Sequence, residues 1–109
     1  MTIATINPTT GESESTFVAL TDEQVGAALA RSSAAAKAWA ATSFKERADL
    51  MRAAADILGQ DAERVARLLT TEMGKPIGAA RAELAKSATT MRYYADHAEA
   101  FLAEKELDS

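Results

Sequence analysis

The sequence contains no cysteine, only two prolines and five glycines, and few aromatic side chains. The lack of cysteine excludes disulfide bonds and any thiolate nucleophile contributed by these 109 residues. Three Phe, two Tyr and one Trp supply little large aromatic surface, and 26 of the 109 residues are alanine. Because alanine favours helix but buries little area, we expect a thin helical layer that must pack on something else.

Long apolar runs and an excess of basic residues are also missing. The net charge of −4 and the pI near 5.0 argue against nucleic-acid binding, which needs a basic stripe. No stretch approaches the roughly 20 apolar residues that cross a bilayer, and Met1–Ala4 lacks the basic start of a signal peptide. We therefore expect one globular domain or a piece of a larger one, cytoplasmic, with neither nucleic acid nor membrane as a partner.

Residues 4–19 are the only part of the sequence that reads as extended. β-Branched and aromatic residues flank the segment Asn7–Gly11, in which Pro8 presets φ and Gly11 permits a positive φ. This pattern predicts a short N-terminal β-hairpin. Two strands alone are marginally stable in water, so we expect them to pair with further strands, for which the rest of the sequence offers no pattern.

Two capping boxes, Thr21–Gln24 and Ser43–Glu46, predict the starts of two helices. Apolar residues at steps of three and four carry the first helix to about Trp39 and the second to Leu58. Gly59 is the expected stop of the second helix.

A sharp corner is predicted in the segment Leu68–Pro76. The third helix, which we expect Asp61 to cap, ends at Gly74 because glycine takes a positive φ at little cost. Pro76 suits the first turn of a fourth helix, whose apolar periodicity continues to about Glu104. The segment is thus predicted to be mostly α, with about four helices after the hairpin.

Few side chains suggest chemistry by themselves. His97, the only histidine, is expected on the solvated surface, and of Tyr93 and Tyr94 one is expected in the core and one at an interface. Lys75 could bind an anion, although capping the preceding helix end is the favoured interpretation. Glu72 lies near a helix C-terminus, where a carboxylate is unfavourable unless a cation relieves it, and an exposed, tolerated acid is the alternative. No catalytic constellation emerges.

Five motifs follow one another along the chain: Ile6–Glu12 (INPTTGE), Trp39, Glu46-Arg47, Thr71–Pro76 (TEMGKP) and Met91–Ala95 (MRYYA). In this order and spacing they resemble the opening of the NAD(P)-dependent aldehyde dehydrogenases, and the resemblance covers essentially the whole chain. The stretches 7–17 and 86–94 are most similar to the bacterial succinate-semialdehyde dehydrogenases of that family.

The resemblance implies an α/β, Rossmann-like complete enzyme of which residues 1–109 form the N-terminal part of the cofactor-binding domain. Such an enzyme would oxidise an aldehyde, here succinate semialdehyde, to a carboxylic acid with NAD or NADP, as a homo-oligomeric dimer or tetramer. The family's catalytic cysteine, its general-base glutamate and its cofactor contacts lie outside this region. The segment alone is therefore expected to be inactive and incomplete.

The resemblance also implies one site within the chain. A structural monovalent cation would be held by the backbone carbonyls of Thr5 and Ile6 and by the carboxylate of Glu72, and the region Glu83–Ser87 would line the substrate tunnel. The alternative to an enzyme fragment is a free-standing helical protein-interaction module without enzymatic activity, which pairs with another chain through its alanine-lined faces.

Overall fold

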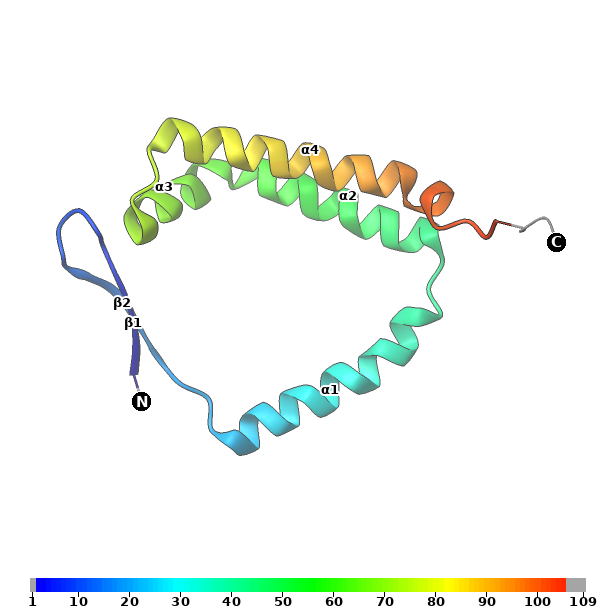
Figure 1. The fold of residues 1–109 in the computed structure, drawn as a ribbon, viewed down its shortest axis with the longest axis horizontal. Coiled ribbons are helices and arrows are strands. Elements are labelled where there is room, and N and C mark those ends of the chain that lie inside the picture. Colours follow the sequence, from blue (N-terminus) through cyan, green and yellow to red (C-terminus); the bar gives the residue numbers. More distant parts are fainter. Residues whose placement is uncertain (1, 106–109) are drawn as a thin grey trace.

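A computed structural model describes residues 2–105, which form a β-hairpin followed by four helices (Figure 1). This confirms the predicted order of elements. Helices α2 and α4 run side by side, while α1 stands apart from them. The elements are β1 (Thr2–Ile6), β2 (Ser13–Val18), α1 (Asp22–Ala40), α2 (Phe44–Gln60), α3 (Ala62–Met73) and α4 (Ile77–Phe101).

The hairpin is antiparallel, with Ile3 opposite Phe17. Its turn forms as predicted, because the Asn7 side chain accepts a hydrogen bond from the Thr9 amide at 2.9 Å and Gly11 takes a φ of 75°. Within the described residues the sheet contains only these two strands. Both strands therefore keep a free edge, as the sequence led us to expect.

Both capping boxes are present. The Thr21 hydroxyl accepts from the Gln24 amide at 3.2 Å, and the Gln24 side chain accepts from the Thr21 amide at 2.9 Å. Ser43 and Glu46 repeat the arrangement at 3.2 and 2.7 Å. The hydrogen bond from the Ser43 amide lowers the pKa of the Glu46 carboxyl, so this cap is charged at neutral pH.

Of the two predictions about the junction of α2 and α3, the stop at Gly59 is wrong, and the cap at Asp61 is confirmed in position but not in its side-chain hydrogen bond. Gly59 does not stop α2, which continues to Gln60, because Asp61 has near-helical angles (φ −98°, ψ 10°) and joins the helices without a left-handed residue. Asp61 occupies the N-cap position of α3 but makes no capping hydrogen bond. Its carboxylate instead accepts from the Arg64 guanidinium, with Nε at 2.9 Å from Oδ2.

The corner between α3 and α4 is confirmed, with small shifts in its limits. Gly74 ends α3 with a φ of 72°, and its amide donates to the Thr70 carbonyl at 3.0 Å. Pro76 is extended (ψ 133°) and therefore precedes α4, which begins at Ile77 and ends at Phe101, short of the predicted end.

The core is thin and lies where α4 crosses α2 and α3. Among residues 2–105, its buried apolar residues are four alanines and a single large side chain, Leu84. Because alanine methyls let the helices approach closely, little area is buried at each contact. The buried set is Ala55, Ala66, Ala80, Leu84 and Ala88.

The chain is extended and leaves much apolar surface uncovered. Its radius of gyration is 19.2 Å, whereas a compact chain of this length has about 13 Å. Its accessible surface is 8659 Å², against about 5,800 Å² for a compact protein of this mass. None of the 19 residues of α1, all of them described, is buried, and Leu29 and Trp39 are at least half exposed. The described residues do not cover their own apolar faces.

Exposed ion pairs link α4 to the helices beneath it. Each joins an arginine to a carboxylate on a neighbouring helix, and each partner is about half exposed, so each contributes little to stability. The pairs are Arg81–Glu63 (2.8 Å), Arg92–Asp56 (2.6 Å) and Arg52–Asp96 (2.6 Å).

One of these pairs predicts a modest pH dependence. The hydrogen bond from Arg81 is the main cause that lowers the pKa of Glu63 below its ordinary value of 4.5, with Arg67 adding to it. Its stabilisation is therefore present above that value and lost as the pH falls through the lowered pKa. We expect the thermal midpoint of helix unfolding to fall between about pH 5 and about pH 3, and to fall less in Glu63→Gln. Circular dichroism measures the midpoint at each pH. If the thermal midpoint depends on pH equally in Glu63→Gln and in the unsubstituted chain, this role of the pair is contradicted.

Candidate functional site

The hairpin turn lies against the α3–α4 corner. Strand β1 contacts α3, and the Pro8 ring approaches the backbone of Gly74 so closely that a Cβ added there would lie 3.1 Å from Pro8 Cγ. Glycine is therefore needed at position 74 both for its positive φ and for this close approach. The corner and the turn form one junction.

On the hairpin side of this junction, two features distinguish Thr5 and Ile6. The Thr5 hydroxyl oxygen is buried and has no hydrogen-bond partner within the described residues. The register of the strand pair also shifts between Thr5 and Ile6. The extra residue at this shift is Glu14 on β2, whereas β1 has no strand on its other side within the described residues, so backbone carbonyls on that open edge can take other partners. Ile6 is 49% exposed, and its apolar side chain has no oxygen, so only its backbone carbonyl could serve as a ligand.

On the helix side, Glu72 occupies the last turn of α3 and is half-buried. Within residues 2–105 its carboxylate has neither an ion pair nor a hydrogen bond, and it faces the unfavourable end of the helix dipole. Carboxylate and carbonyl oxygens are donors that suit a hard cation. The part of the chain described holds no group of three acidic or histidine side chains that could bind a metal, so backbone oxygens would have to complete such a site.

Lys75 has a different partner from those predicted. Its ammonium forms an ion pair with Glu83 on α4, which places a carboxylate where an anion would bind. Glu83 also borders an open hollow on the outer face of α4, together with Lys86, Ser87 and Thr90. Glu83, Lys86 and Ser87 belong to the stretch that the resemblance assigns to the substrate tunnel, whereas Leu84 of that stretch is buried in the core, and the assignment stays a prediction.

The aromatic residues of α4 lie on its surface. His97 is exposed, as predicted, and stacks on Tyr93 with ring centroids 4.3 Å apart; its Nδ1 is 2.7 Å from the Tyr93 carbonyl oxygen. Tyr93 and Tyr94 are 49% and 53% exposed, so the prediction that one of them is core is wrong. Neither ring is enclosed by another element: Tyr94 borders an open groove between α2 and α4, and Tyr93 contacts aromatic rings of its own helix.

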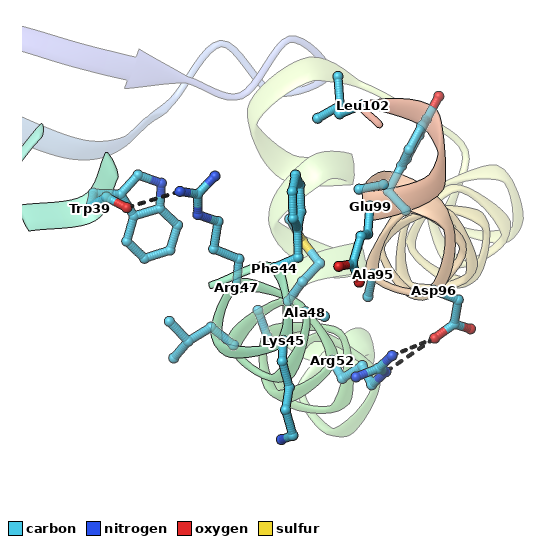
Figure 2. Close-up of a pocket in the computed structure, with 15 residues that line it drawn as sticks. Trp39, Phe44, Lys45, Arg47, Ala48, Arg52, Ala95, Asp96, Glu99 and Leu102 are labelled. Atoms are coloured by element: carbon cyan, nitrogen blue, oxygen red, sulfur yellow. Dashed lines mark hydrogen bonds and ion pairs between the residues drawn. The ribbon is translucent and has the colours of Figure 1, made fainter. Parts of the chain in front are cut away.

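A groove of about 600 Å³ runs between α2 and the C-terminal half of α4 (Figure 2). Phe44, Ala48 and Leu102 are among the apolar residues that line it. At one rim the Arg52 guanidinium binds Asp96, and this hydrogen bond is the main cause that raises the pKa of Arg52. The residues lining the groove include no pairing of a nucleophile with a base, so its chemistry is that of a packing surface.

Sequence reasoning missed one residue at the corner between α1 and α2. Arg47 was identified from the sequence only as part of a family motif, yet its guanidinium donates hydrogen bonds to the carbonyls of Trp39 and Ala40 at the end of α1. A signal was available, because α1 ends in Ala40-Ala41 without the glycine or asparagine that closes many helices.

The comparisons with known proteins agree along the whole chain. The aldehyde dehydrogenase family model matches residues 1–109. A succinate-semialdehyde dehydrogenase [NADP(+)] 1 of Mycobacterium tuberculosis is 48% identical over 109 residues, which is 100% of this chain and 24% of the relative. An aldehyde dehydrogenase of Paenarthrobacter nicotinovorans is 52% identical over 103 residues, or 94% of this chain and 22% of the relative.

Solved structures give the same result. The succinic semialdehyde dehydrogenase of Streptococcus pyogenes, solved in complex with NADP+, superposes with a TM-score of 0.91 at 33% identity. The match covers 97% of this chain and 24% of that one. The chain thus spans about a quarter of the length of the curated relatives it matches. No helix in the described range is long and apolar enough to cross a membrane.

Proposed function

Because this chain belongs to the aldehyde dehydrogenase family, we propose that it is the N-terminal part of the cofactor-binding domain of an enzyme that oxidises succinate semialdehyde to the carboxylic acid. The observation that carries the proposal is the 48% identity to a succinate-semialdehyde dehydrogenase over all 109 residues. The proposed enzyme uses NADP or NAD, works in the cytoplasm and assembles as a dimer or tetramer.

The physical character of the chain supports this proposal. Its uncovered surface exceeds that of a compact protein by roughly 3,000 Å², which is the size of a large interface. The apolar faces of α1 and of the α2–α4 pair would lie against the remaining domain. Without a cysteine the chain also lacks the nucleophile of the proposed mechanism, so the segment alone is expected to be inactive.

A chimera tests the proposal directly. Residues 1–109 would replace the matching segment of the Mycobacterium tuberculosis relative, and oxidation of succinate semialdehyde would be followed by the absorbance of NADPH. We expect kcat/KM within about tenfold of the parent enzyme, equivalent to about 1.4 kcal/mol of transition-state free energy.

Two controls separate the proposal from its alternatives. The isolated chain should show no turnover and should self-associate through its uncovered faces. A soluble but inactive chimera, together with an isolated chain that sediments as a compact, cooperatively folding monomer, would favour the helical interaction module instead.

We further propose that the hairpin–corner junction holds a structural monovalent cation in the complete enzyme. The carbonyls of Thr5 and Ile6 and the carboxylate of Glu72 would be its ligands in this chain, and the remaining ligands would come from outside it. The buried, unpartnered Thr5 hydroxyl and the unpaired carboxylate in the described range support an oxygen-lined cation site. The cation's positive charge would offset the dipole at the end of α3.

The cation proposal predicts a salt-specific stability. In the chimera, the free energy of unfolding in potassium or sodium chloride should be about 1.4 kcal/mol higher than in choline chloride when the cation is at about ten times its Kd. Glu72→Gln should abolish most of this difference because it removes the charged ligand that this chain contributes, whereas Glu23→Gln on α1 should preserve it. Equal stability in choline and potassium chloride before any substitution would reject the site.

A further inference from the structure

The last turn of α1 depends on side chains from the next segment. Its C-cap, Ala41, has helical angles (φ −84°, ψ −7°), so no left-handed residue closes the helix. The Thr42 hydroxyl donates to the Trp39 carbonyl at 2.7 Å. Arg47 Nη2 lies 3.2 Å from the carbonyl oxygens of both Trp39 and Ala40. A cation is favourable at this end of a helix.

Arg47 also binds the corner itself and two aromatic rings. Its Nη2 donates to the Thr42 carbonyl at 3.0 Å and its Nε to the Thr42 hydroxyl at 2.9 Å. Its guanidinium carbon lies 5.7 Å from the ring centroids of both Trp39 and Phe44. Figure 2 shows the side chain reaching from α2 to the carbonyl of Trp39. One guanidinium therefore joins the end of α1 to the start of α2.

Among the described residues, the side chains that hydrogen-bond the last turn of α1 from outside the helix are those of Arg47 and of Thr42 in the corner itself. No residue of this fully described helix is buried, and it lies apart from the α2–α4 pair (Figure 1). A helix joined only by the corner 41–43 would sample many directions. We propose that Arg47 is a positioning residue that fixes the direction of α1, so that α1 and the α2–α4 pair hold their apolar faces at a set separation before anything covers them.

Distance measurements on the 109-residue chain test this without reference to catalysis, with labelled chain diluted in an excess of unlabelled chain so that self-association adds no distances between labels. Because the chain has no native cysteine, spin labels can be placed by Ser33→Cys on α1 and Ala53→Cys on α2. A reference pair, Ala53→Cys with Ala100→Cys, reports the α2–α4 pair. Pulsed electron spin resonance should give a narrow distance distribution for both pairs.

Arg47→Ala should broaden the α1–α2 distribution at least about twofold, because the helix direction is then an ensemble. Arg47→Lys should broaden it partially, since lysine keeps the charge but loses the planar fork of donors. Lys45→Ala is the matched control, because Lys45 pairs with Asp49 on its own helix. The reference pair should stay narrow throughout.

Three outcomes would overturn the proposal. They are a broad α1–α2 distribution in the unsubstituted chain, an unchanged distribution in Arg47→Ala, and equal broadening of both label pairs, which would mean that Arg47 supports the whole fold. None of these outcomes depends on the enzyme activity proposed above, so a chimera that fails leaves this inference standing.

Discussion

Replacing Ala80 by glutamate is expected to detach α4 from α3. Ala80 is completely buried, and it packs with Ala66 and Leu84 at the centre of the thin core. A glutamate there would bury a charge without a partner and would also force the helices apart, since the site has room only for a methyl group. The free energy of unfolding should fall by at least about 3 kcal/mol, which is enough to undock helices whose core contains a single large buried side chain.

Ala79 provides a control one residue away. It lies on the exposed side of α4, so Ala79→Glu carries the same change in composition, charge and helix propensity without entering the core. We expect an effect within about 0.5 kcal/mol. Amide hydrogen exchange of the isolated chain measures both variants. Protection in α3 and α4 should be lost in Ala80→Glu and kept in Ala79→Glu, and equal protection in the two would show that the helices do not dock through this contact.

The elements of this fold were predictable because their signals are local. The boxes at Thr21 and Ser43 and the glycine at position 74 each satisfy backbone groups within a few residues of themselves, so tertiary packing has little to change. The prediction that Gly59 stops α2 was wrong because it too rested on a local signal alone. A glycine permits a helix to stop but does not require it, and the helical angles of Asp61 let the chain continue.

Burial was less predictable, because it depends on what the chain packs against. Tyr93 and Tyr94 were predicted to be one core and one interface residue, but both are about half exposed, because the groove that Tyr94 borders between α2 and α4 is open. The junction is similar. From the sequence, Glu72 was recognised as a carboxylate at the unfavourable C-terminal end of a helix. The sequence did not show that β1 would pack against that helix, which follows only from the fold. The contact of Pro8 with the corner at Gly74 follows from the hairpin packing and from no local signal.

The close contact between the hairpin and the corner predicts that Gly74→Ala is more costly than an ordinary left-handed glycine substitution. Any L-residue at a φ of 72° costs about 1 kcal/mol. The new methyl would also lie 3.1 Å from Pro8 Cγ, so either the turn or the end of α3 must move. We expect a total loss of about 2 kcal/mol or more, with loss of protection in both the hairpin and the last turn of α3.

Gly11→Ala separates these two contributions. Gly11 has nearly the same φ, 75°, but an added Cβ meets nothing within 4 Å, so only the conformational cost of about 1 kcal/mol should remain. Pro8→Ala removes the ring carbon that crowds position 74. The double variant Pro8→Ala/Gly74→Ala should therefore recover at least about 0.5 kcal/mol relative to the sum of the single changes. If the single changes are additive and Gly74→Ala costs no more than Gly11→Ala, the hairpin does not rest on the corner, and the oxygen-lined junction between them does not form.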